Sequence, residues 1–184
     1  MSDEGVEALA QFDQRHVERY QSVLSEVAVP YRIDRGRPIR SEYPSYGLDA
    51  AGGLVSTAYD LAQFESALDS SRTVPIPLSF NTLDKMWSNV TFEVNEQRIT
   101  MPTGLGWFVT TESGQRLVWT FGHIANASSA LIVKMIRPAT ATRPSQRLTL
   151  IMLANSGGLA EGYDLENANV TSSPFVKIFL RLFI

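Results

Sequence analysis

The spacing of apolar residues changes near the middle of the chain. Up to about residue 103, apolar positions recur every three or four residues, which is typical of helices with one buried face. From residue 104 onward, apolar and polar residues alternate, which is typical of strands. The pattern predicts a helical first part followed by a β-sheet.

The first predicted helix spans residues 4–27, and Pro30 ends it. Extended chain follows, with a turn at residues 34–36. We expect the basic stretch around this turn to be a solvated hairpin tip rather than a binding patch. The helix would bury an apolar stripe made of Leu9, Phe12, His16, Val17, Tyr20, Val23 and Leu24. The basic residues of the turn are Arg32, Arg35, Arg37 and Arg40.

A tight turn at Gly52-Gly53 precedes a second predicted helix, for which Ser56 or Thr57 is the N-cap. Asp60 lies where its carboxylate meets the positive end of that helix. A short helix is expected between residues 78 and 87, and a loosely patterned stretch runs to Pro102. The predicted inward stripe of the second helix is Leu61, Phe64, Ala67 and Leu68.

Four strands are predicted, with short links that favour an antiparallel meander. The chain then closes with a helix that Ser172 or Ser173 caps and Pro174 begins. Lys177 and Arg181 are the only charged residues of this helix and mark its solvent-exposed side. We expect the rest of the helix to pack on the sheet. The strands cover residues 105–111, 116–121, 129–136 and 147–154.

The predicted fold class is therefore α+β, with a mostly antiparallel sheet and flanking helices. We expect a single, partial domain over residues 1–184. Its expected parts are a helical and extended lead-in at 1–49, a helical segment at 50–103, antiparallel strands at 104–156 and the closing helix at 172–184.

The amino-acid composition excludes several classes of function. With 44% hydrophobic and 19% charged residues and a net charge of −3, the chain is typical of globular domains and offers no basic surface for nucleic acid. The absence of cysteine excludes disulfides, thiolate catalysis and cysteine zinc sites. The two histidines, His16 and His123, are far apart, so we expect no metal and no cofactor.

Targeting signals are not apparent in these residues. The acidic start MSDEGVEALAQF has no apolar core of a signal peptide, and no apolar run is long enough to span a membrane. Localisation is cytoplasmic by default, and a periplasmic or secreted parent protein stays open.

Six phrases occur in the order seen in one enzyme family. They are AAGGLVSTAYDLAQF, GLGWFV, VWTFG, SSALIVK, LTLIMLANS and the closing SSPFVKIFLRLF. In this order the chain, from about residue 25, resembles the β-lactamase-like serine hydrolases. These include class C β-lactamases, penicillin-binding proteins, D-amino-acid peptidases and esterases. The resemblance implies a partial β-lactamase/transpeptidase-like fold.

The resemblance also implies a Ser-x-x-Lys nucleophile motif and a Tyr-x-Asn or Ser-x-Asn motif. The residues three before Lys85, Lys134 and Lys177 are threonine, leucine and proline, so the chain has no Ser-x-x-Lys. It has no Tyr-x-Asn either. The Ser79–Asn81 phrase matches Ser-x-Asn formally but is expected to be a helix cap. The family carries both motifs upstream of its Gly-Gly-Leu phrase, so this chain looks like the C-terminal part of such a hydrolase, without nucleophile or base.

The family's third motif, Lys/His-x-Gly, falls on Thr120, Phe121 and Gly122 in the register without gaps. Thr120 replaces the usual cation, which puts recognition of an anionic substrate in doubt. A register three residues later would keep His123 and lose the glycine. In the first register the resemblance implies that the backbone N–H of His123 contributes to an oxyanion hole; packing at a strand end is the alternative.

Two further positions carry weaker signals. Asn155 resembles a family position that reaches substrate, although asparagine before Ser-Gly-Gly is also ordinary turn chemistry. Trp107 and Trp119 lie on adjacent predicted strands, where a cross-strand pair is favoured over a cleft wall.

Two functions follow. In the first, the parent protein hydrolyses esters, amides or lactams through an acyl-enzyme, and this chain alone is inactive. In the second, the chain is a stand-alone, non-catalytic module that binds a small molecule or a protein. An incomplete sheet predicts association with the missing N-terminal half or with further copies.

Overall fold

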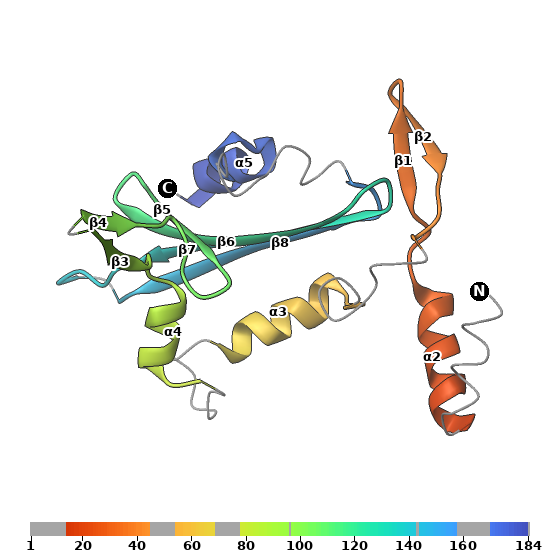
Figure 1. The fold of residues 1–184 in the computed structure, drawn as a ribbon, viewed down its shortest axis with the longest axis horizontal. Coiled ribbons are helices and arrows are strands. Elements are labelled where there is room, and N and C mark those ends of the chain that lie inside the picture. Colours follow the sequence, from red (N-terminus) through yellow and green to blue (C-terminus); the bar gives the residue numbers. More distant parts are fainter. Residues whose placement is uncertain are drawn as a thin grey trace.

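A four-stranded antiparallel sheet forms the centre of the protein (Figure 1). The computed structural model describes residues 14–44, 54–68, 78–95, 97–142, 144–157 and 170–183. The strands follow one another in space as in the chain, which confirms the predicted meander and the α+β class. They are β5 (Phe108–Glu112), β6 (Gln115–Ile124), β7 (Ser128–Arg137) and β8 (Gln146–Ala154).

Two tight hairpins use the same turn chemistry. Between β5 and β6, Ser113 and Gly114 have φ of +50° and +75°. Between β1 (Tyr31–Asp34) and β2 (Arg37–Arg40), Arg35 and Gly36 have φ of +49° and +77°. Two successive positive φ values mark the type I′ turn, whose twist matches the flanking strands. The turn predicted at residues 34–36 is confirmed, and its four arginines are exposed as expected.

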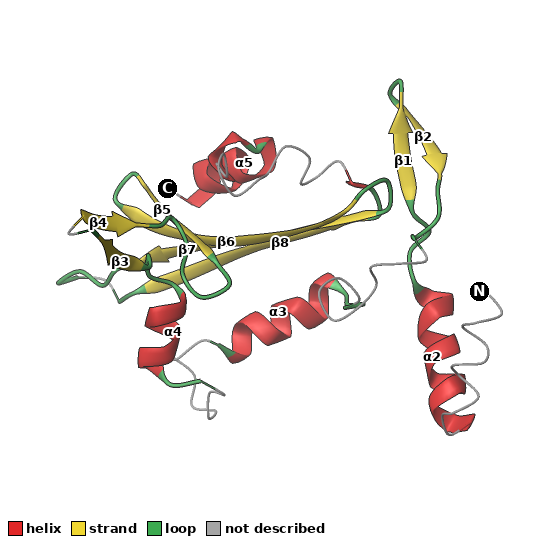
Figure 2. Cartoon of the chain, in the orientation of Figure 1, coloured by secondary structure: helices red, strands yellow, loops and turns green. Residues whose placement is uncertain are grey.

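One face of the sheet packs against the closing helix α5 (Pro174–Phe183), as predicted (Figure 2). Side chains alternate along each strand, so every second residue of β6 and β7 points toward α5. A short 3₁₀ turn (Val170–Ser172) precedes the helix. The buried cluster consists of Leu117, Trp119, Leu131, Val133 and Met135 from the sheet with Val170, Val176, Phe179 and Leu180.

The opposite face packs against α3 (Ala58–Ala67) and α4 (Phe80–Met86). Thr57 and Ser79 cap these helices, since each hydroxyl accepts a hydrogen bond from the N–H three residues on. The buried hydrophobic cluster on this side consists of Leu68, Leu83, Trp87 and Val118.

The buried side of α3 differs from the predicted stripe. Phe64 is 54% exposed and Ala67 is also exposed, whereas Glu65 is only 9% exposed. The helix is rotated so that Leu61, Glu65 and Leu68 face the sheet. The reason is a charge on the sheet itself, Lys134, which pairs with Glu65.

Two other helices expose more apolar surface than predicted. The helix α2 (Gln14–Glu26) forms, but Val23 and Leu24 on its expected buried face are exposed. The solvent-exposed side of α5 contains apolar residues as well as Lys177 and Arg181. Ile178 and Leu182 are largely exposed there. Residues 4–13 of the first predicted helix lie outside the described residues.

A third hairpin was not predicted. It joins β3 (Thr91–Val94) and β4 (Gln97–Thr100) within the segment expected to be helical, and both strands are short. Gly104 follows it at a very close approach to α4, because a Cβ there would lie 2.0 Å from the carbonyl oxygen of Met86. Only glycine allows this contact.

The predicted tryptophan pair is wrong. Trp119 points toward α5 and stacks on Phe108, its cross-strand neighbour, with 4.4 Å between ring centroids. Trp107 lies on the other side of the sheet, against the cluster of α3 and α4. It precedes β5 rather than belonging to it, so the alternation assumed from the sequence does not apply. None of the helices in the described ranges is long and apolar enough to cross a membrane.

Candidate functional site

The residues expected to form the third motif, Thr120, Phe121 and Gly122, lie with the following His123 on the second half of β6. Thr120 and Gly122 pair with Ile132 and Ala130 of β7. Because side chains alternate along a strand, Thr120 and Gly122 face the α3 side, whereas Phe121 and His123 face the α5 side. Phe121 packs with Trp119 and Phe108.

The outer edge of this half-strand is open in the described part of the chain. The pairing of β5 with β6 ends where Phe108 meets Trp119, so residues 120–124 have a strand neighbour on the β7 side alone. Gly122 and His123 are exposed. Backbone N–H groups on an open edge can be offered to a ligand.

The side chain of His123 is held against the segment after β8. Its Nε2 lies so close to Gly157 that a Cβ on that residue would be 2.9 Å away. A second contact fixes the same segment, since the Ser129 hydroxyl donates to the carbonyl of Ser156 at 2.6 Å. The ring of His123 therefore packs at the strand end, while its backbone stays on the open half of β6.

Asn155 follows β8, whose last residue, Ala154, lies across β7 from His123. Its side-chain amide donates to the carbonyl of Val29 at 2.8 Å, and its carbonyl accepts from the N–H of Tyr31 at 2.7 Å. Asn155 thus joins the chain before β1 to the end of the sheet. The structure thus leaves Asn155 two strands away from β6 and uses its amide within the protein.

A second polar group, which the sequence reasoning missed, lies under α3. Lys134 of β7 donates to Oε2 of Glu65, and both side chains are buried. The ammonium lies over the rings of Trp87 and Trp107, 4.8 and 4.3 Å from their centroids. Burial lowers the pKa of Lys134 below its ordinary value, although the hydrogen bond and charge of Glu65 act in the opposite direction.

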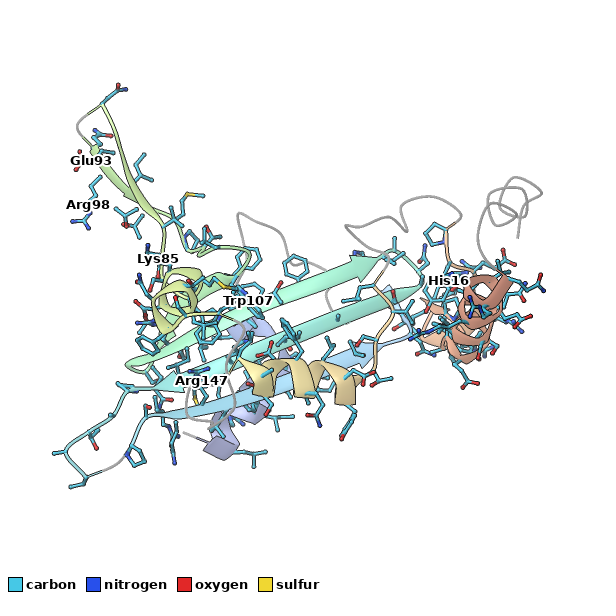
Figure 3. The ribbon with its side chains drawn as sticks, turned by 90° about the horizontal axis from the view of Figure 1, so that it is seen from below. His16, Lys85, Glu93, Arg98, Trp107 and Arg147 are labelled. Carbon is cyan, nitrogen blue, oxygen red and sulfur yellow. The ribbon has the colours of Figure 1, made fainter. Side chains whose placement is uncertain are left out.

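Arg147 of β8 extends this group. Its guanidinium lies 4.7 Å from the ring of Trp87 and donates to the carbonyl of Leu68 at 2.9 Å. Figure 3 shows Arg147 and Trp107 on the α3 side of the sheet. A lysine in the middle of the apolar run SALIVKMI was the signal that a buried charge partner had to exist.

Metal chemistry has no support in the described ranges, since they contain no cluster of three or more histidine, cysteine, aspartate and glutamate side chains that could hold an ion.

Comparison with known proteins gives one clear result. Searches of curated proteins and of solved structures found no match to this chain. A family model described as beta-lactamase matches residues 6–173, which is most of the chain. The match includes both α3 and the strand that carries Thr120–His123. The expected resemblance is confirmed, and the chain belongs to the β-lactamase family, on a scaffold of the serine-hydrolase type.

Proposed function

We propose that this chain is the C-terminal portion of a serine hydrolase domain that cleaves an ester, amide or lactam bond through an acyl-enzyme. The observation that carries the proposal is the position of the third-motif residues. They lie on a β6 half-strand whose outer edge is open in the described part of the chain, and the chain belongs to the β-lactamase family.

The chain would supply one wall of the active site. A serine hydroxyl attacks poorly unless a neighbouring base takes its proton, and the 184 residues contain no Ser-x-x-Lys. Nucleophile and base would therefore come from polypeptide outside these residues. The backbone N–H of His123 would stabilise the tetrahedral intermediate, a contribution typically worth about 3 kcal/mol.

Thr120 sets the expected substrate class. A hydroxyl on this face cannot offset the charge of a substrate carboxylate as a lysine would. We therefore expect a substrate that is uncharged next to the scissile bond.

The first test is activity of the chain alone. Incubated with a nitrophenyl ester, it should release no burst of nitrophenol and take up no serine-directed phosphonate. A burst that the phosphonate blocks would contradict the proposed division of roles. The complementary test reads the genomic DNA in frame upstream of Met1. If it encodes Ser-x-x-Lys, the joined polypeptide should show the burst, and its serine-to-alanine variant should not.

A second function, a non-catalytic binding module, is favoured by one observation, the replacement of the motif cation by Thr120. It predicts that no nucleophile-bearing segment is encoded upstream and that no polypeptide containing this chain forms an acyl-enzyme. Ligand binding without turnover would then be the activity.

The proposed partner is polypeptide that completes the sheet. Among the described strands none pairs with the outer edge of β8, and Leu54 before α3 and Tyr59 in its first turn are highly exposed. Such surface favours association, either with the nucleophile-bearing half or with a second copy.

A further inference from the structure

A half-open pocket of about 200 Å³ lies between α3 and the strands β7 and β8. From the helix it is lined by Ala62, Glu65 and Ser66, and from the strands by Lys134, Arg147, Thr149 and Ile151. None of the third-motif residues lines it. Thr120 lies in the same row of the sheet as Ile151, with Ile132 between them, so the pocket is about two strand spacings, or roughly 10 Å, from Thr120.

One acceptor in the wall of this pocket has no donor. Oε1 of Glu65 is buried and accepts no hydrogen bond from the described residues, while Oε2 is bonded to Lys134. A buried acceptor without a donor destabilises the folded protein. Glu65 lines the pocket, so a small tilt of its carboxylate would bring Oε1 to a ligand while Oε2 stays bonded to Lys134. A ligand with a hydrogen-bond donor would remove this cost.

The fixed charges favour an anion. Two cations, Lys134 and Arg147, line the pocket against one carboxylate, Glu65. The hydroxyls of Ser66 and Thr149 add donors that suit an anionic oxygen. A carboxylate of the ligand would therefore lie toward Arg147, where a planar guanidinium matches its geometry.

The group of the ligand that donates to Oε1 should be a neutral hydroxyl rather than an ammonium. An ammonium group at Oε1 would lie beside the ammonium of Lys134 and near Arg147, and like charges at this distance repel. A hydroxyl supplies the hydrogen bond without a charge. Ala62 and Ile151 leave an apolar wall for a short hydrocarbon chain.

We propose that this pocket binds a short hydroxy acid, with its hydroxyl donating to Oε1 of Glu65 and its carboxylate near Arg147. The binding site is separate from the third-motif strand and does not depend on the proposed hydrolase activity.

The test uses three acids of similar size with the 184-residue chain. Isothermal titration should detect 2-hydroxypropanoate with a Kd on the order of millimolar, as expected for so small a ligand. Propanoate, which lacks the hydroxyl, should bind about tenfold or more weakly because Oε1 stays without a donor. Alanine, which carries an ammonium instead, should also bind more weakly than the hydroxy acid.

Two helix variants serve as a matched pair. Ala62→Leu fills the pocket without altering any charge, and it should abolish binding while leaving the melting temperature close to that of the parent chain. Ala67→Leu adds the same side chain to an exposed position of α3 that does not line the pocket, and it should leave binding unchanged.

The proposal is overturned if 2-hydroxypropanoate does not bind, if propanoate or alanine binds equally well, or if Ala62→Leu and Ala67→Leu bind the hydroxy acid alike. If Ala62→Leu does not fold, the comparison of the three acids on the parent chain decides.

Discussion

Lys134 of β7 and Glu65 of α3, which are 69 residues apart in sequence, form a buried ion pair across the interface of helix and sheet. The pair determines which side of α3 faces the sheet. It also places the ammonium over two tryptophan rings, which connects the sheet with both α3 and the segment around α4.

Removing one partner of this pair should be costly. Lys134→Met leaves the carboxylate of Glu65 buried without its cation, and we expect a loss of about 3–5 kcal/mol in the free energy of unfolding. The double variant Glu65→Leu with Lys134→Met removes both charges and should recover most of that loss. Urea denaturation checks this. A single variant as stable as the parent chain would contradict a buried pair.

The same lysine predicts how stability depends on pH. Burial lowers the pKa of Lys134 in the folded chain, whereas the unfolded chain has the ordinary value of 10.5. Between the two values the unfolded state binds more protons, so stability should rise with pH, by at most about 1.4 kcal/mol per pH unit.

Burial also raises the pKa of Tyr43, which makes the stability fall with pH above about pH 10. The effect of Lys134 must therefore be measured against a variant that keeps Tyr43. The double variant at Glu65 and Lys134 retains Tyr43 and should lack the rise. Urea denaturation of both chains between pH 8 and 10 measures the difference, and equal slopes would refute the assignment to Lys134.

Two glycines near the third motif should respond differently to alanine. At Gly157 a Cβ would meet Nε2 of His123 at 2.9 Å and the N–H nitrogen of Asn126 at 3.1 Å. Gly157→Ala should displace the imidazole and cost about 1–3 kcal/mol of stability. The NMR signals of His123 and thermal unfolding report both effects.

Gly122→Ala is the control for that substitution, because the nearest atom to its Cβ would be Ala130 Cβ at 3.9 Å, an ordinary contact. We expect a stability change within about 0.5 kcal/mol. Equal changes in stability for the two substitutions would contradict the close contact between His123 and Gly157.

The β5–β6 turn can be strengthened or weakened by single substitutions. Asparagine tolerates positive φ better than serine, so Ser113→Asn should raise stability by about 0.5 kcal/mol. Gly114→Ala places a Cβ at φ +75° and should lower stability by about 1 kcal/mol or more. Melting temperatures measure both, and the turn assignment fails if the two substitutions act in the same direction.

Association should be measurable on the chain itself. Given the unpaired outer edge of β8 in the described sheet, light scattering at micromolar concentration should report a dimer or larger species. Thr149→Pro would interrupt this edge strand, but it would also disturb the pocket and is therefore not a selective variant. Leu54→Ser, at an exposed position before α3, is the milder variant and should reduce the assembled fraction. A clean monomer of the parent chain would contradict the prediction.

Most of the secondary structure could be predicted because its signals are local. The alternation in residues 105–154, the caps at Thr57 and Ser79 and the turn residues at 35–36 each depend on neighbours in sequence. The β3–β4 hairpin was not predicted because each of its strands has only four residues, too short a run for alternation to distinguish a strand from a loop.

The polar group under α3 could not be predicted from local pattern. A glutamate inside a helix is ordinarily assigned to the wet face, and its burial depends on a lysine on a distant strand. Thr120 and Phe121 were predicted to lie on a strand, whereas Gly122 and His123 lie on β6 beyond the predicted end at residue 121. The close approach of Gly157 to His123 could not be predicted, since it depends on how the chain turns after β8.

The meander also has a consequence for how the protein folds. The contacts between β5, β6, β7 and β8 join segments that are consecutive in the chain, and such local contacts form early because short loops close at little entropic cost. The contact of Lys134 with Glu65 closes a much longer loop. We therefore expect the sheet to form in the folding transition state and α3 to dock later. A large change in folding rate on substituting Val133, with Glu65 variants changing mainly the unfolding rate, would be the kinetic signature of this order.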